Sequence, residues 1–370
     1  QLHEPLPVLG WVRQQAQPPS GPGLGGQARP TGAAVQVERC LQQPRAAGHR
    51  VVYARHDRGC DMGFYRQDPA LEAWLAATVG RLAEARGGWD GAISVTCLIA
   101  DSDPPGTGPT RVRGASVAGH QGRYPASVVK LVYLAAIEAW LAQDLLGDGP
   151  ELQRALADMI RDSGNDATSY VVDLLTGTGS GPELPAEPFR RWSEQRQLIN
   201  RWFEGLGWPE WQGCNACQKT WAEGPYGRER QSYGAALENR NRLTTEVTAR
   251  LLLAVMAGEW VSPQASARMQ ALLARSLDPE ARRADPENQV DGFVGEGLPA
   301  GSRLWSKAGW MSQARHDAAY CVVPDTPPFL LVAFGEGQGP ATDATWIPAL
   351  CRGLVQWLQT PADGTPSLPM

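Results

Sequence analysis

The run from Ser127 to Ala142 constrains the fold of this chain more than any other feature. It is almost entirely apolar, yet it carries Lys130 three positions after its first serine. An apolar run of this length predicts a buried central helix. Residues i and i+3 of a helix lie on one face, so the Ser127 hydroxyl and the Lys130 amine can meet. The chain is therefore expected to carry a serine and a lysine into its interior.

Two interpretations of this pair remain open at the level of the sequence. A lysine that loses its hydration has a lowered pKa, and its amine can then take a proton from a serine hydroxyl. Alternatively, Lys130 extends to the surface from a core helix and Ser127 only caps that helix. A serine and a lysine at this spacing occur by chance about once in a chain of this length, so the pair alone decides nothing.

Composition and charge narrow the class of protein. The 370 residues are 42% hydrophobic, which is enough for the core of one large domain or two small ones. The net charge is −5, and lysines and arginines form no basic stripe, which argues against a nucleic-acid surface. The longest apolar stretch, 125–142, contains two charged residues and is too short for a bilayer span. We expect a monomer that acts on a small molecule or a peptide and has no transmembrane segment.

The chain begins at Gln1 and shows no charged-then-apolar leader, so we expect an exported protein, periplasmic or extracellular, whose signal peptide has been removed. It contains seven cysteines, of which Cys214 and Cys217 are the only close pair. A zinc site needs a second pair or nearby histidines, and these are lacking. We therefore expect a local disulfide or two free thiols at this pair, and neither a metal nor another cofactor.

The first part of the chain differs in character from the rest. Residues 15–32 are rich in proline and glycine and have no apolar period, which is typical of an extended or flexible segment. Regular helical period begins at Leu71. We expect an N-terminal extension over residues 1–70, a main domain over residues 71–360 and a flexible tail at 361–370.

The pattern of the main domain predicts one interleaved α/β domain of the α+β type. A helix at 71–86 precedes two strands at 92–99 and 111–117, and a block of helices follows, at 127–142, 151–160, 166–175, 189–203, 245–256 and 262–277. Three strands at 303–311, 318–323 and 329–335 and a helix at 344–358 complete the domain. This order favours a five-stranded antiparallel sheet with the N- and C-terminal helices on one face and an all-helical subdomain on the other.

Two further polar motifs follow the serine–lysine pair along the chain. Ser163-Gly164-Asn165 lies at the junction of two predicted helices, where glycine and asparagine break the helical run and leave polar side chains on a loop. An ordinary helix cap would also explain it. Lys307-Ala308-Gly309 lies on a predicted strand, where a glycine allows close approach of another backbone. An ordinary edge strand with a lysine is the alternative there.

Together, the three motifs resemble those of the penicillin-recognising serine hydrolases, which include class A β-lactamases and D-alanyl-D-alanine carboxypeptidases. That family carries S-x-x-K at the start of a buried helix, S-x-N on a loop and K-[ST]-G on a strand. The resemblance covers roughly residues 71–360. It implies the β-lactamase/DD-peptidase fold and a serine hydrolase that acts on an amide or β-lactam bond through an acyl-enzyme.

The resemblance also implies a role for each motif residue. Ser127 is the nucleophile, and Lys130 is its base or proton relay. Ser163 passes a proton to the leaving nitrogen, Asn165 hydrogen-bonds the substrate amide, and Lys307 supplies positive potential. The oxyanion hole is expected from two backbone N–H groups, those of Ser127 and Trp310.

Three departures from the family pattern concern substrate binding. Ala308 lacks the hydroxyl with which relatives bind a substrate carboxylate, and Gly309 is followed by the bulky Trp310. Arg315 could partly replace that hydroxyl as a bidentate partner, although an exposed turn arginine is an equal alternative.

A further departure concerns deacylation. The Glu-x-x-Leu-Asn segment that supplies the deacylating glutamate in class A enzymes does not occur. Glu229 lies nearest the expected position, with Glu223 and Glu238 as competitors. The alternatives are therefore a carboxypeptidase-like or esterase-like enzyme, or a slow or inactive module that binds cell-wall peptide.

Overall fold

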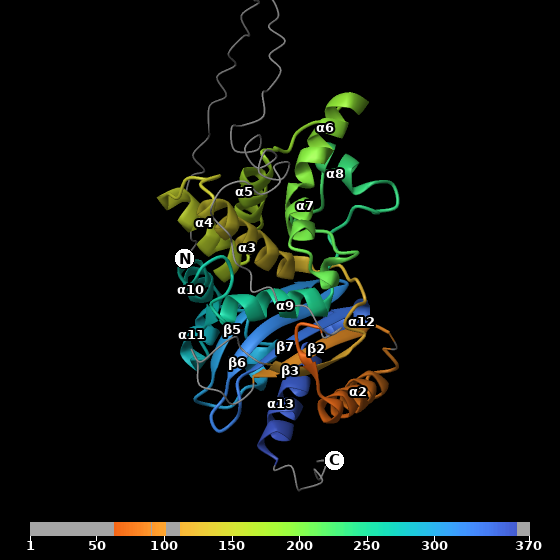
Figure 1. Ribbon diagram of the computed structural model, residues 1–370. Helices are drawn as coiled ribbons and strands as arrows, with labels where there is room; N and C mark the ends of the chain where they lie inside the picture. Colours follow the sequence, from red (N-terminus) through yellow and green to blue (C-terminus); the bar gives the residue numbers. More distant parts are fainter. Residues whose placement is uncertain (1–62, 90, 101–111, 361–370) are drawn as a thin grey trace, which may run out of the picture.

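The computed structural model describes residues 63–89, 91–100 and 112–360 (Figure 1). Residues 1–62 of the expected extension and the expected tail at 361–370 lie outside the described residues. The described chain begins with a short strand, β1 (Arg66–Gln67), and a helix, α2 (Pro69–Glu84). Asp68 caps that helix by accepting from the backbone N–H groups of Ala70 and Leu71.

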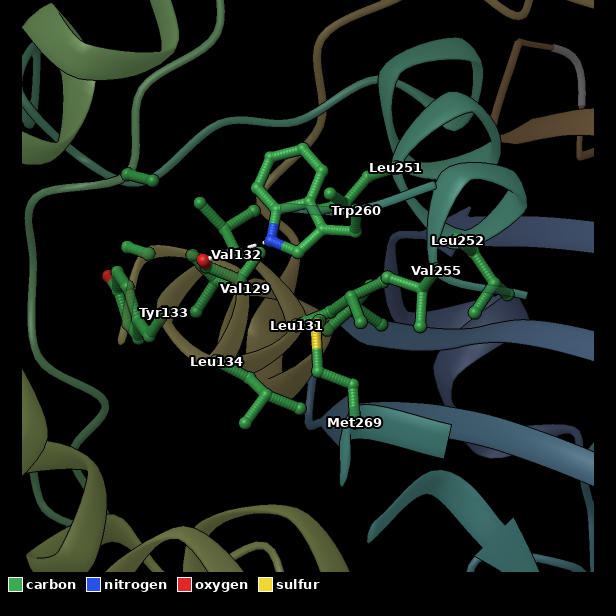
Figure 2. Packing of buried hydrophobic residues seen from close by; sticks show 14 of the residues in the cluster. Val129, Leu131, Val132, Tyr133, Leu134, Leu251, Leu252, Val255, Trp260 and Met269 are labelled. Carbon is green, nitrogen blue, oxygen red and sulfur yellow. Dashed lines mark hydrogen bonds between the residues drawn. The ribbon is translucent and has the colours of Figure 1, made fainter. Parts of the chain in front are cut away.

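The predicted central helix is α3 (Val129–Ala142), preceded by a 3₁₀ turn, η1 (Ala126–Val128). Every residue from Val129 to Trp140 is buried, which confirms the buried central helix. Figure 2 shows α3 packed against Leu252 and Val255 of the neighbouring helix and against Trp260. The Trp260 indole N–H donates to the carbonyl of Ala135 at 3.0 Å, so the ring is held by a hydrogen bond as well as by packing.

The sheet has the order β1-β3-β2-β7-β6-β5-β4. The five predicted antiparallel strands are present as its long strands, but the sheet has seven strands because two-residue strands pair at both edges. Two residues carry no apolar alternation, so sequence pattern could not reveal the edge strands. The bounds are β2 (Ile93–Ala100), β3 (Val112–Val117), β4 (Ala274–Arg275), β5 (Arg303–Met311), β6 (Ala314–Val322) and β7 (Phe329–Glu336).

Side chains of the sheet alternate between two apolar layers, as the strand period requires. On β7, Leu331 and Ala333 belong to the layer under α2 and α13 (Trp346–Gln359). Leu330 and Val332 belong to the opposite layer, under α9 (Thr245–Met256). Figure 1 shows α2 and α13 on one side of the sheet and α9 on the other, between the sheet and the helical subdomain. This layering confirms the predicted placement of the terminal helices.

The helical subdomain differs from the prediction in detail. The expected helix at 189–203 is two helices, because Gln197 has a ψ of 4° and leaves the helical conformation. The helix expected over 262–277 ends at Leu273, because the next two residues pair with β5. The remaining helices are α4 (Pro150–Arg161), α5 (Asn165–Thr176), α6 (Ala186–Arg196), α7 (Leu198–Gly205), α8 (Gly227–Tyr233), α10 (Pro263–Leu273), α11 (Pro279–Ala284) and α12 (Gln338–Thr342). Two further 3₁₀ turns are η2 (Pro209–Trp211) and η3 (Val294–Gly297).

The central helix carries a second buried charge, Glu138. Its carboxylate accepts from two nitrogens of Arg268 on α10, the Nε contact being 3.1 Å long. Burial raises the pKa of Glu138, and Arg268 acts in the opposite direction. Within residues 63–89, 91–100 and 112–360, no helix is both long and apolar enough to cross a bilayer.

Replacing Arg268 by alanine tests how much this pair contributes to the fold. The change leaves a buried carboxylate without its cation, and we expect it to cost about 2 kcal/mol of unfolding free energy near pH 7. Without Arg268 the folded-state pKa of Glu138 rises further above its unfolded value, so the cost appears as pH rises and shrinks as pH falls toward 5. Urea unfolding at several pH values measures both effects.

The matched control is Arg268→Ala in a Glu138→Gln background, where no charge is left unpaired. There the loss should fall below about 1 kcal/mol and should not vary with pH. An equal loss in both backgrounds would mean that Arg268 acts through packing and not through Glu138.

Candidate active site

The turn that carries Ser127 is packed tightly against strand β5. Ala126 lies in the left-handed region with a φ of +46°, and the 3₁₀ turn then leads into α3. A Cβ built on Gly309 would lie 2.8 Å from the Ser127 backbone nitrogen and 2.9 Å from that of Val128. A side chain at this position is therefore excluded, which accounts for the glycine that sequence reasoning assigned to a close approach.

Two buried side chains join the segment before Ser127 to the sheet. Arg123 donates from Nε to Ser94 Oγ at 2.8 Å. His316 accepts the Gly335 N–H at Nδ1, 3.1 Å away, so Nε2 carries the proton and donates to the Tyr124 carbonyl at 2.9 Å. Burial lowers the pKa of His316 to about 4, which keeps the ring neutral in this arrangement. The turn is thus fixed by both packing and hydrogen bonds.

Lys130 is buried among oxygen atoms from two of the predicted motifs. Its Nζ lies 3.0 Å from Ser127 Oγ, 3.2 Å from Ser163 Oγ and 3.0 Å from Asn165 Oδ1. It also donates to the Ser163 carbonyl. Burial lowers the pKa of Lys130 to about 7, so the neutral amine is accessible near neutral pH. Lys130 therefore does not extend to the surface, and the first alternative raised by the sequence is excluded.

Ser163 joins the second motif to the third. It lies between α4 and α5 with a φ of +58°, so its backbone is in the left-handed region. Its Oγ accepts from Lys307 Nζ at 3.0 Å as well as from Lys130. Burial and the charges of Arg275 and Lys130 lower the pKa of Lys307. Hydrogen bonds therefore run without a break from Ser127 through Lys130 and Ser163 to Lys307.

Gln289 is part of this site and was not found from the sequence. Its Oε1 accepts from Lys307 Nζ at 2.5 Å and from the Ala308 N–H at 3.1 Å. Its Nε2 donates to the carbonyls of Ile160 and Arg161 at 3.2 and 2.8 Å, at the end of α4. It thus holds Lys307 against the loop of Ser163. A single glutamine in a loop has no motif or period, so nothing in the sequence distinguished it.

The structure does not bring Glu229 to the serine–lysine pair. Its buried carboxylate is held by Arg196 through contacts of 2.8 and 3.2 Å, and by Ser180 Oγ at 2.8 Å. No hydrogen bond among the described residues links it to Ser127 or Lys130. The two competitors, Glu223 and Glu238, are exposed. The placement inferred by counting back along the chain failed because the intervening segment folds onto Arg196.

The residues expected to bind a substrate carboxylate are also placed differently. The Ala308 side chain belongs to the apolar layer under α13, so it faces away from Ser127. Arg315 donates to the carbonyls of Ala341 and Gly292 at 3.2 and 3.3 Å, and it stacks on Phe293. Its guanidinium is therefore committed to the protein. Trp310 is 39% exposed, beside the glycine.

The cysteine pair and the question of a metal can be addressed within the described residues. Cys214 and Cys217 are free thiols, which decides between the two alternatives left by the sequence. Burial raises the pKa of each to about 11, so both remain protonated at neutral pH. Across residues 63–89, 91–100 and 112–360, no three or more His, Cys, Asp or Glu side chains gather as a metal-ion site.

Comparison with known sequences identifies one family. The profile described as the beta-lactamase enzyme family matches residues 143–358, more than half of the 370 residues. The matched range contains Ser163, Asn165 and Lys307 and begins after Lys130. No curated protein matches the chain by sequence.

Several solved structures have the same fold. A β-lactamase from Sphaerobacter thermophilus is 18% identical, with 77% of this chain and 97% of that chain covered and a TM-score of 0.52. PBP-A is 15% identical, with 79% and 97% covered and a TM-score of 0.53. A mutant of PBP-A, described as an acyl-enzyme complex with penicillin G, is 14% identical, with the same coverage and TM-score. These likenesses concern the fold, and they confirm the fold class expected from the sequence.

Gly309→Ala tests the close contact between β5 and the Ser127 turn. The added methyl would meet backbone nitrogens that cannot move aside without shifting the turn, so we expect a loss of about 1–3 kcal/mol in unfolding free energy. Hydrogen exchange should become faster at the Val128 amide, which donates to the Pro125 carbonyl at 3.0 Å. Urea unfolding and exchange followed by mass spectrometry measure the two effects.

Gly80→Ala on α2 is the matched control, because a Cβ there meets no atom within 4 Å. It should leave stability unchanged or raise it by about 0.5 kcal/mol, as expected for alanine in a helix. If Gly309→Ala behaved like Gly80→Ala, the contact would be looser than the structure indicates.

Proposed function

Because the chain belongs to the beta-lactamase enzyme family, we propose that it is a serine hydrolase that opens an amide or β-lactam bond through an acyl-enzyme on Ser127. One observation supports this function above all. The Ser127 hydroxyl lies 3.0 Å from a buried amine whose pKa is lowered to about 7. A neutral amine at that distance can serve as the general base for a serine.

Acylation uses the hydrogen-bonded groups in sequence. Lys130 takes the Ser127 proton while Oγ attacks the carbonyl carbon and forms a C–O bond. The backbone N–H groups of Ser127 and Trp310 stabilise the negative oxygen of the tetrahedral intermediate. When the C–N bond breaks, Lys130 returns its proton through Ser163 to the leaving nitrogen. The protein thereby regains its original protonation state, and the acyl group remains as an ester on Ser127.

Asn165 and Lys307 support this step. Asn165 Oδ1 accepts from Lys130, which leaves its Nδ2 to donate. No described residue accepts from that Nδ2, so it is available for a substrate carbonyl. Lys307 donates to Ser163 Oγ and keeps the hydroxyl oriented between the two lysines. Its positive charge also favours a substrate that carries negative charge on the leaving-group side.

Deacylation is expected to be slow. Among the described residues, Lys130 is the one titratable side chain hydrogen-bonded to Ser127, and Glu229 is paired with Arg196 instead. Lys130 would therefore have to activate water in the second half-reaction as well. This placement of Glu229 favours a second candidate, a penicillin-binding module that forms a lasting acyl-enzyme with cell-wall peptide or a β-lactam. An esterase-like or carboxypeptidase-like enzyme would release the acyl group from small esters or peptides.

Intact-mass measurements during incubation with benzylpenicillin test the proposal. We expect one added penicilloyl group on the wild type and none on Ser127→Ala. Lys130→Arg should acylate at least about 100-fold more slowly, because a guanidinium does not lose its proton. Lys219→Arg is the matched control, since Lys219 is buried beside Asp173 and Ser180 and makes no contact with Ser127.

Each outcome separates the candidates. A persistent adduct indicates the binding module, and rapid return to the unmodified mass indicates a β-lactamase. Turnover of small esters without a penicillin adduct indicates the esterase-like enzyme. Acylation of Ser127→Ala at the wild-type rate would place the nucleophile elsewhere and refute the assignment.

A further inference from the structure

Strand β5 continues past Gly309 into a surface whose composition differs from the buried site. Trp310 and Met311 are 39% and 37% exposed, unlike most large apolar side chains of the described chain. Arg240 lies beside them, with Nη2 3.8 Å from Met311 Sδ. Its guanidinium carbon is 3.7 Å from the centroid of the Tyr124 ring. We call Tyr124, Arg240, Trp310 and Met311 the β5-end site.

The charge of Arg240 is not compensated by a carboxylate in the described part of the chain. The half-buried or buried arginines 196, 250 and 268 each pair with an acidic side chain. The contacts of Arg240 are instead an aromatic ring and a thioether. Stacking fixes the plane of a guanidinium and leaves its N–H groups directed outward along the edges, where they can bind an anion in bidentate fashion. The β5-end site is therefore prepared for a negatively charged group.

The position of the β5-end site relative to the reacting bond follows from strand geometry and rests on the proposed function. Ser163, which protonates the leaving nitrogen, is hydrogen-bonded to Lys307. Met311 is four residues farther along the same strand, about 13 Å from Lys307. A carbonyl bound at the N–H groups of Ser127 and Trp310 lies between these ends. The leaving group then points toward Lys307, and the acyl side chain points toward Met311 and Arg240.

We propose that the β5-end site binds a carboxylate on the acyl half of the substrate. Arg240 forms the ion pair, and Trp310 and Met311 contact the apolar part of the same side chain. Arg315 cannot take this role, because its N–H groups are committed to backbone carbonyls. The natural substrate class is accordingly an amide or a peptide with an acidic group on the acyl side of the bond that is cleaved.

Two penicillins that differ by one carboxylate provide the test: benzylpenicillin and its α-carboxy derivative, altered only on the acyl side chain. Binding is measured by calorimetry in the Ser127→Ala background, so that no covalent step contributes. We expect the carboxylated compound to bind about tenfold more tightly, as a charge-assisted pair predicts. Arg240→Gln should abolish this ratio, and Arg240→Lys should retain part of it.

Arg242→Gln is the matched control. Arg242 is two residues away, is exposed and donates to the Gly213 carbonyl, so the ratio should not change. Equal affinity of Ser127→Ala for the two penicillins would overturn the proposal. An equal loss of affinity for both compounds in Arg240→Gln would also overturn it, because Arg240 would then only support Tyr124. Loss of acylation in the wild type with the ratio intact would refute the proposed function while leaving the β5-end site in place.

Discussion

The structure depends on the burial of one amine. Lys130 sits on a helix that is otherwise apolar, and three side-chain oxygens from Ser127, Ser163 and Asn165 surround its Nζ. A buried ammonium without such partners would cost several kcal/mol. The left-handed backbone at Ser163 brings its Oγ and carbonyl to the amine, and Gly309 lets β5 lie against the serine turn. The fold thus spends much of its local precision on keeping this nitrogen solvated by the protein.

Lysine and arginine have separate roles in this chain. Only three of its 34 basic residues are lysines, and Lys130, Lys219 and Lys307 are all buried. An ammonium can lose its proton when it is buried, whereas a guanidinium stays charged. Two of the three lysines meet at Ser163 Oγ, where each lowers the tendency of the other to carry charge. Arginines form the ion pairs and, at Arg240, the cation of the β5-end site.

How far the sequence predicts the structure depends on whether a residue belongs to a pattern. The helix at 245–256 and the strand at 303–311 were predicted to the residue, because apolar period and capping mark their ends. Ser163 was found through a motif with fixed spacing. Gln289 and the pairing of Glu229 with Arg196 were not predictable, since both depend on contacts between segments far apart in the sequence. Ala308 was assigned to the cleft, but strand alternation turns its side chain into the core.

The central claim is that Lys130 is neutral for much of the time near pH 7. A titration by NMR with ¹³Cε-labelled lysine measures this directly, because the chain contains three lysines and Lys130→Arg identifies one signal. The account predicts a pKa of about 7 for Lys130. A pKa near 10.5, the ordinary value of a lysine, would contradict it, because Lys130 would then stay charged beside Ser127 and could not accept its proton.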